Sequence, residues 1–251
     1  VGVTGVVLDT TDSEGNQDEQ AIKKAELLQE KTKATYPFLI PDKNMMNGRL
    51  QGISAFPETF FVDKNGNYGA LGHGISDVDT GELLHIDDGN LYQAQIVGIQ
   101  KGSSGNPGEL AGLIRYDSDR VIGSIKKNGE NGIYGNFTGS PDQITLMRMP
   151  MAYKQELETG PAQILCCVDG QVSAYDAEIV KIDLNHEDTN KSFVIHVIDQ
   201  ELIDKTGGIV QGMSGSPVIQ NGKFVGAITH VFVQDSTGGY GIFAENMLKN
   251  I

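Results

Sequence analysis

The sequence predicts a mainly β chain, a sandwich or barrel, preceded by a shorter β-α-β-β segment. From Tyr68 onward helical periodicity almost disappears, and strand-like runs alternate with short clusters of Gly, Asn, Asp and Ser. Before that point, residues 1–67 combine short apolar runs with one amphipathic stretch of helical spacing. We therefore expect two segments, residues 1–67 and 68–251, that meet near Asn67–Tyr68.

The elements of the first segment follow from local patterns. "VGVTGVVLD" is an apolar run with the β-branched residues typical of a buried strand. In "DSEGNQDEQAIKKAELLQEKTK", Ile22, Ala25 and Leu28 fall on one face, which predicts a helix. "YPFLIPD" predicts a second strand, and "AFPETFFVDKNGN" predicts a third strand that ends in a hairpin turn at Asn65-Gly66.

The second segment contains many short strand-like runs and little else. Short helices are predicted only at "QELIDKT" and "AENMLKN". The predicted strands are "LYQAQIVGIQ", "RVIGSIKK", "PAQILCCVDG", "AEIVKIDL", "SFVIHVID", "SPVIQ" and "KFVGAITHVFV". Such spacing is typical of an all-β sandwich or barrel.

Composition excludes several classes of protein. Hydrophobic residues make up 39% of the 251 residues and charged residues 21%, so a packed core is expected and global disorder is not. The net charge of −14 argues against nucleic acid as a partner, because phosphates would be repelled. No apolar run approaches the roughly 18 residues of a membrane span, and no signal peptide is visible.

The two cysteines are predicted to be structural, with no disulfide, redox or metal-binding role. Cys166 and Cys167 are adjacent, and a disulfide between neighbours would strain the peptide. No CxxC and no Cys/His spacing suited to a metal is present. We therefore interpret both as small apolar residues of a strand and expect neither a metal nor an organic cofactor.

"GMSGSP", between two predicted strands, is the segment that suggests catalysis. A nucleophilic serine needs exposure, a base, and amide donors for the developing oxyanion. A tight loop of the form Gly-x-Ser-Gly-x-Pro supplies the first and the third, with the amides of Gly212 and Ser214 as the donors. The alternative is an ordinary Gly/Ser turn between strands.

The context of this loop adds a resemblance. "GMSGSPVIQNGKFVGAITH" resembles the active-site segment of chymotrypsin-like serine proteases. The resemblance implies a chymotrypsin-like double β-barrel with Ser214, not Ser216, as nucleophile. Met213 stands where those enzymes usually have an Asp that pairs with a new N-terminus after cleavage.

A more specific resemblance covers about residues 68–251. "GALGHGISDVDTG", "GSSGNPGELAG", "GSIKKNGENGIYGN", "ETGPAQILCCVDG", "TGGIVQGMSGSPVIQNGK", "GAITHVFV" and "GYGIFAENML" together resemble the SpoIVB family of sporulation serine peptidases. That family implies a serine endopeptidase, secreted into the space between mother cell and forespore, that cuts a regulator of a membrane protease. Protein substrates are implied, and the chain itself is one candidate.

The same resemblance suggests the base. The family's "GHG" motif falls on His73, whose imidazole can take the serine proton and return it. His85, His186 and His196 lack such a setting and are interpreted as structural.

The orienting acid is expected shortly before the serine motif. That position is Asp199, since 214 − 199 = 15. Asp204 in the same segment, and Asp117 or Asp119 in "RYDSDR", remain alternatives.

By analogy with chymotrypsin-like enzymes, Thr229 and His230 are expected to line the primary specificity pocket. A histidine there would favour a polar or acidic substrate residue. The alternative is a histidine packed under the hairpin.

Residues 1–67 resemble the later half of a thioredoxin-like thiol–disulfide oxidoreductase without its CxxC. A redox activity is therefore not expected. The main alternative to a peptidase is a protein-binding or scaffold module on a peptidase fold whose site is inactive.

Overall fold

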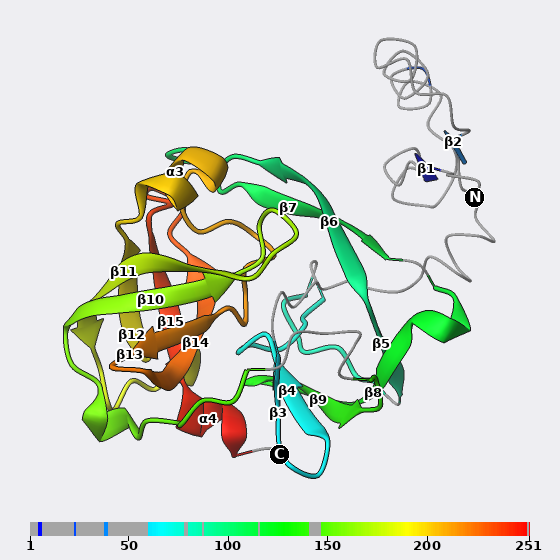
Figure 1. Ribbon diagram of the computed structural model, residues 1–251, viewed down its shortest axis with the longest axis horizontal. Coiled ribbons are helices and arrows are strands. Elements are labelled where there is room, and N and C mark those ends of the chain that lie inside the picture. The colour runs from blue at the N-terminus through cyan, green and yellow to red at the C-terminus, as the bar shows by residue number, and fades with distance from the viewer. Residues whose placement is uncertain are drawn as a thin grey trace. The chain divides into compact units, whose positions relative to one another are not determined.

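The computed structural model divides the chain into two units, Val1–Ser54 and Ala55–Ile251 (Figure 1). It describes residues 60–77, 80–86, 88–114, 116–140, 147–249 and 251, together with 5–6, 23 and 38–39. The predicted boundary at 67/68 falls within a hairpin of the larger unit.

The smaller unit contains a pair of parallel strands. β1 (Gly5–Val6) pairs with β2 (Phe38–Leu39), and the two lie in the first two runs predicted as strands. Lys23 is helical, as the amphipathic pattern predicts. The remainder of that helix, and the features on which the thioredoxin-like resemblance depends, lie outside the described residues.

The C-terminal part of the larger unit is a closed six-stranded barrel, which confirms the mainly β prediction (Figure 1). Its strand order is β10-β11-β12-β15-β14-β13. The strands are β10 (Gly160–Cys166), β11 (Ser173–Ile182), β12 (Phe193–Val197), β13 (Pro217–Gln220), β14 (Lys223–Val231) and β15 (Gly238–Phe243).

Side chains in this barrel alternate between core and solvent. On β11, Tyr175, Ala177 and Ile179 are buried while the residues between them are exposed, which is the period of two expected for a strand with one buried face. A glycine also makes room for Phe193, a large side chain of the core. A Cβ on Gly241 would lie 2.2 Å from the ring of Phe193, so only glycine fits there.

The N-terminal part of the larger unit is a five-stranded antiparallel sheet in the described residues, with the order β3-β4-β9-β8-β5. Its strands are β3 (Phe60–Val62), β4 (Asn67–Ala70), β5 (Gly89–Tyr92), β8 (Val121–Gly129) and β9 (Gly132–Phe137). The predicted turn at Asn65-Gly66 joins β3 to β4, and Gly66 has the positive φ that such a turn requires. The sheet has its own core around Tyr68, Leu91 and Ile133.

A third β-structure is a separate hairpin of β6 (Ala94–Gln100) and β7 (Glu109–Ile114). The run "LYQAQIVGIQ", predicted as one strand, is divided at Gln93 between β5 and β6, which belong to different sheets.

Helices are short and lie at strand ends. They are α3 (Gln200–Thr206) and α4 (Ala244–Leu248), both as predicted, and the 3-10 turns η1 (Ser118–Arg120), η2 (Lys154–Glu156) and η3 (Thr189–Lys191). Within the described residues, no helix combines the length and the apolar character needed to cross a bilayer.

Candidate active site

The loop that carries Ser214 leads from the segment after α3 into β13 and is fixed to β14. The amide of Gly215 donates to the carbonyl of Ile228 at 2.8 Å, and the amide of Ile228 donates to the carbonyl of Ser216 at 3.0 Å. Ser214 is half-buried, whereas Ser216 is fully buried. Of the two serines in "GMSGSP", Ser214 is therefore the one with access to solvent.

The two amides predicted as an oxyanion hole are those of Gly212 and Ser214. Gly212 has φ +98°, a conformation that favours glycine, and a Cβ there would lie 3.1 Å from Leu110. Neither amide donates a hydrogen bond to any described residue. Both N–H groups therefore have no acceptor within the loop and are available to bind an anion.

Met213 takes a structural role between them. It is fully buried in the barrel core, and its sulfur accepts a hydrogen bond from the amide of Val210 at 3.4 Å. An apolar side chain thus supports the loop from inside, at the position where chymotrypsin-like enzymes usually have an Asp.

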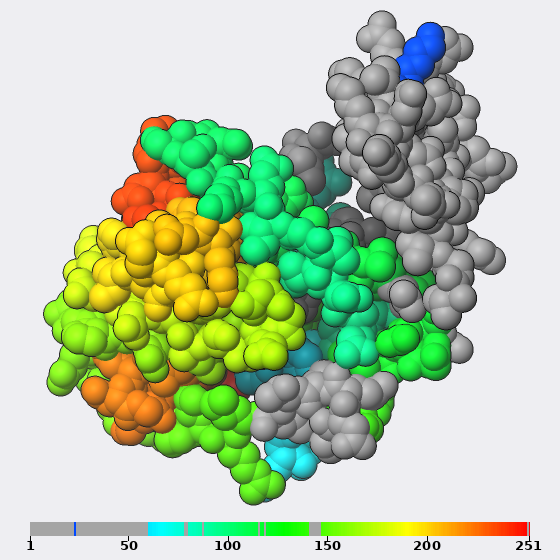
Figure 2. Space-filling model, turned by 45° about the horizontal axis from the view of Figure 1, so that its top comes forward, coloured from blue at the N-terminus to red at the C-terminus, as the bar shows by residue number. Residues whose placement is uncertain are grey.

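The β6–β7 hairpin supports the same loop from the other side. The amide of Leu110 donates to the carbonyl of Gln211 at 2.9 Å, and the amide of Gln211 donates to the carbonyl of Gly108 at 2.8 Å. Figure 2 shows this hairpin running over the surface beside α3. These bonds fix the chain just before Gly212.

His73 lies on the loop that follows β4. Leu71 and Gly72, the two residues before it, both have positive φ values, so the chain turns sharply. Leu71 is buried, and its burial offsets the strain of a non-glycine residue in this region. A Cβ on Gly72 would lie 2.8 Å from Ile242 and 3.1 Å from Thr229, so the backbone here packs directly on β14 and β15 of the closed barrel.

The tautomer of His73 follows from one hydrogen bond. Nδ1 lies 2.9 Å from the carbonyl oxygen of Gly74. Because a carbonyl oxygen can only accept, Nδ1 carries the proton and Nε2 keeps its lone pair. This is the tautomer that a general base for a serine needs.

Ser214 and His73 contact adjacent residues of β14, Thr229 and His230. The Ser214 hydroxyl donates to the carbonyl of Thr229 at 3.1 Å. The rings of His73 and His230 are 5.3 Å apart, centre to centre. Within the described residues no hydrogen bond joins Ser214 to His73, an arrangement common in unliganded sites, where such bonds tighten once substrate is present.

Thr229 and His230 differ in what they offer a substrate. The Thr229 hydroxyl is buried and donates its one proton between two carbonyl oxygens, that of Asn190 at 2.6 Å and that of Tyr240 at 3.2 Å. Only its backbone is near Ser214. His230 is exposed, and its imidazole remains the one side chain of the predicted pair that can reach a ligand.

The pKa of His230 lies below its ordinary value. The first cause is partial loss of hydration, since an imidazole can keep accessible surface while protein atoms crowd the rest of it. Repulsion by His73 when it is protonated, and by Lys191, also lowers the pKa of His230, whereas Asp188 raises it. His230 is therefore biased toward its neutral form. Sequence reasoning missed Asp188 and Lys191, because "HEDTNKS" reads as an ordinary polar turn.

Asp199, the expected acid, lies at the N-cap of α3. One carboxylate oxygen accepts from the amides of Glu201 and Leu202, at 2.9 and 3.1 Å, and the other accepts from the amide of Asp176 at 3.1 Å. Its hydrogen bonds in the described part of the chain do not include His73. The three backbone partners of this carboxylate thus belong to α3 and to β11 of the barrel.

The alternative acids are also spread over the surface. Asp204 is exposed on α3 and accepts from Gln200 at 2.9 Å. Asp117 and Asp119 are exposed around η1, between β7 and β8. None of the three has a hydrogen bond to His73 in the described residues.

The order of motifs matches a known family over most of the chain. Residues 45–248 match the model of the SpoIVB peptidase S55 family. The chain belongs to this peptidase family. The predicted resemblance is thereby confirmed, and the chain is a peptidase by family. Among curated protein sequences, none matches it significantly.

Solved structures similar to this S55 peptidase include other proteases. The active form of the Rv3671c protease from M. tuberculosis is 15% identical, covering 86% of this chain and 89% of that one, with a TM-score of 0.43. An HtrA-type protease with a tripeptide is 12% identical, covering 65% and 58%, with a TM-score of 0.36. Human heparin binding protein is 11% identical, covering 74% of each chain, with a TM-score of 0.33.

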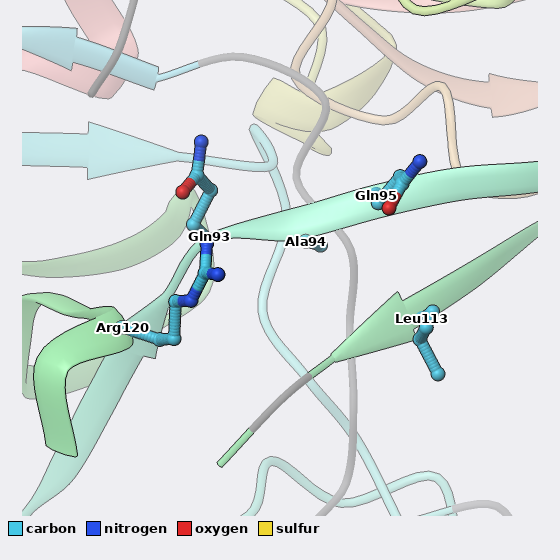
Figure 3. Close-up of a pocket in the computed structure, with 5 residues that line it drawn as sticks. All are labelled: Gln93, Ala94, Gln95, Leu113 and Arg120. Carbon is cyan, nitrogen blue, oxygen red and sulfur yellow. The ribbon is translucent and has the colours of Figure 1, made fainter. Parts of the chain in front are cut away.

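A cavity of about 250 Å³ in the S55 peptidase lies away from these residues, beside the β6–β7 hairpin (Figure 3). Figure 3 shows Ala94 and Gln95 on β6 and Leu113 on β7, with Gln93 and Arg120 at one end. None of the predicted site residues lines it. In the described part of the chain, no group of three His, Cys, Asp or Glu side chains could hold a metal ion.

Proposed function

We propose that the chain is a serine endopeptidase that cleaves protein substrates through an acyl-enzyme. The observation that carries the proposal is that Ser214 contacts Thr229 while His73 contacts the adjacent His230. The amides of Gly212 and Ser214, in the same loop as the serine, donate to no partner within that loop. Membership of a peptidase family supports the proposal.

The reaction follows from the roles of these groups. The Oγ of Ser214 attacks the carbonyl carbon of the peptide bond while its proton passes to Nε2 of His73. The oxyanion is held by the amides of Gly212 and Ser214. As the C–N bond breaks, His73 returns the proton to the leaving amine. Water then attacks the ester by the same route, releases the acid and restores the Ser214 hydroxyl.

Ser214 must turn away from Thr229 for this to happen. In the unliganded structure its hydroxyl donates to the Thr229 carbonyl. A rotation about its Cα–Cβ bond is a change between staggered side-chain positions and needs no movement of the backbone. We propose that substrate binding brings this rotation.

The finer role, cleavage of a regulator of a membrane protease during sporulation, is proposed from the family alone. His230 is proposed as the residue that contacts the substrate side chain before the cut, and Thr229 as a backbone contact. A comparison of peptide-library cleavage by wild type and His230→Ala tests this, and identical preferences would contradict it.

Fluorophosphonate labelling followed by mass spectrometry tests the activity itself. We expect one adduct, on Ser214, that is lost in Ser214→Ala and in His73→Ala. Ser216→Ala and His186→Ala are the matched controls, since one is the neighbouring buried serine and the other an exposed histidine away from the loop. A folded chain that takes no label would contradict the proposal and favour a binding module with an inactive site.

A further inference from the structure

The side chain of Asn128, on β8, holds the loop that follows His73 to the N-terminal sheet through three hydrogen bonds. Its Oδ1 accepts from the amide of Ile75 at 2.8 Å. Its Nδ2 donates to the carbonyl of Ile75 at 2.6 Å and to that of Leu84 at 2.9 Å. Both N–H donors of this half-buried amide, and one of the two lone pairs of its oxygen, are therefore bonded to the loop.

The bonds of Asn128 close the loop that begins two residues after His73. The amide of Leu84 donates to the carbonyl of Ile75 at 3.0 Å, so Ile75 and Leu84 meet at Asn128. On the other side, the amide of Gly74 donates to the carbonyl of Glu130 at 3.1 Å, in the turn after β8. The peptide between Gly74 and Ile75 is thus fixed at both of its residues.

This peptide contains the carbonyl that receives Nδ1–H of His73. A carboxylate usually holds a catalytic histidine in the required tautomer. Here the partner of Nδ1 is the Gly74 carbonyl, and Asp199 is bonded to three amides elsewhere. The direction of the Gly74 carbonyl depends on where the Ile75 amide is held, and Asn128 holds it.

We propose that Asn128 is a positioning residue for His73, which fixes the Gly74 carbonyl and through it the tautomer and orientation of the imidazole. This inference rests on the proposed serine peptidase activity.

Asn128→Asp is the sharpest variant, because it keeps the shape and the acceptor but opposes a carboxylate oxygen to the carbonyls of Ile75 and Leu84. We expect the rate constant for fluorophosphonate labelling of Ser214 to fall by about 10- to 100-fold, as small misplacements of a catalytic group do. In peptide hydrolysis kcat should fall with little change in KM, and the pH dependence of labelling should change. Asn136→Asp is the matched control, since Asn136 lies on the adjacent β9, is exposed, and its side chain donates to that of Asn67 rather than to the His73 loop.

A purely structural role of Asn128 would have a different signature. It would lower the thermal stability and the fraction of chains that react, while the folded fraction kept the wild-type labelling rate and pH profile. That result would overturn the proposal.

The tautomer of His73 gives a second readout that needs no variant of Asn128. Long-range ¹H–¹⁵N correlation spectra of the wild-type chain, assigned with His73→Gln, should show the proton on Nδ1. A proton on Nε2 would overturn the inference. Should the wild-type chain not react with the fluorophosphonate, the proposed activity fails, while this tautomer still decides the role of the Gly74 carbonyl.

Discussion

Ser214 and His73 lie on two β-structures that are built differently. The loop of Ser214 is part of a closed barrel whose core includes Met213, the residue next to it. The loop of His73 follows a five-stranded sheet and is held to it by backbone bonds and the amide of Asn128. Both loops thus combine backbone bonds with packing, but the side chain that supports the loop of the nucleophile is the apolar Met213, and the one that supports the loop of the base is the polar Asn128.

This difference has a physical consequence. Truncation of a side chain in a packed core leaves a cavity, which lowers the free energy of unfolding of the whole domain. Loss of one polar contact at a loop changes the position of a group with less effect on the whole fold. Changes in the barrel should therefore affect stability most, and changes near His73 should affect rate most.

Phe193→Ala should give the largest loss of stability. Phe193 is 1% exposed and packs against Gly226 and Gly241, so truncation leaves a large cavity. We expect a loss of about 3–5 kcal/mol in the free energy of unfolding. Phe60→Ala is the matched change in the N-terminal sheet, where the ring is only partly buried and packs against Tyr68. Urea denaturation should show a smaller loss there; equal losses would remove the contrast between the two regions.

Substitutions of Asp199 should show whether this residue acts as a helix cap or as the catalytic acid. Asn caps a helix about as well as Asp, whereas Ala at such a position costs about 1 kcal/mol. We therefore expect Asp199→Asn to keep nearly the wild-type stability and labelling rate, and Asp199→Ala to lose stability. Asn in place of a triad acid lowers kcat by about 10⁴-fold. A loss of that size in a folded Asp199→Asn chain would restore Asp199 as the acid.

The smallest expected effect concerns the charge of His230. Its lowered pKa means that the folded chain binds this proton less readily than the unfolded chain, whose histidine has the ordinary value of 6.5. As the pH falls through 6.5 toward the folded pKa, His230 therefore costs stability. In His73→Gln, one of the neighbouring positive charges is removed, so an NMR titration should show the pKa of His230 moving upward. A downward shift would contradict the proximity of the two rings.

The strands of the barrel were predicted from the sequence more completely than those of the N-terminal part of the larger unit. Five of the barrel strands coincide with Val- and Ile-rich runs, and α3 and α4 lie where predicted. The missed strands, β7, β9 and β15, contain glycines that break apolar periodicity. At Gly241 the reason is close packing on Phe193, which no local pattern reveals.

The site shows a similar limit. Sequence motifs suggested Ser214 and His73, and the structure brings both to β14. The spacing that suggested Asp199 could not show that its carboxylate is engaged by α3 and Asp176. Asn128 was missed because "KKNGENG" reads as a turn, and its role depends on a loop more than forty residues away in the chain.

Alkylation by a peptidyl chloromethyl ketone would test the central claim most directly. Such a reagent is held by the serine oxygen at its carbonyl, and the histidine nitrogen displaces chloride at its methylene carbon, so both groups must face one substrate. We predict alkylation of His73 at Nε2 in the wild-type chain and none in Ser214→Ala. Alkylation that spreads over several histidines, or that persists unchanged in Ser214→Ala, would contradict a shared site for Ser214 and His73.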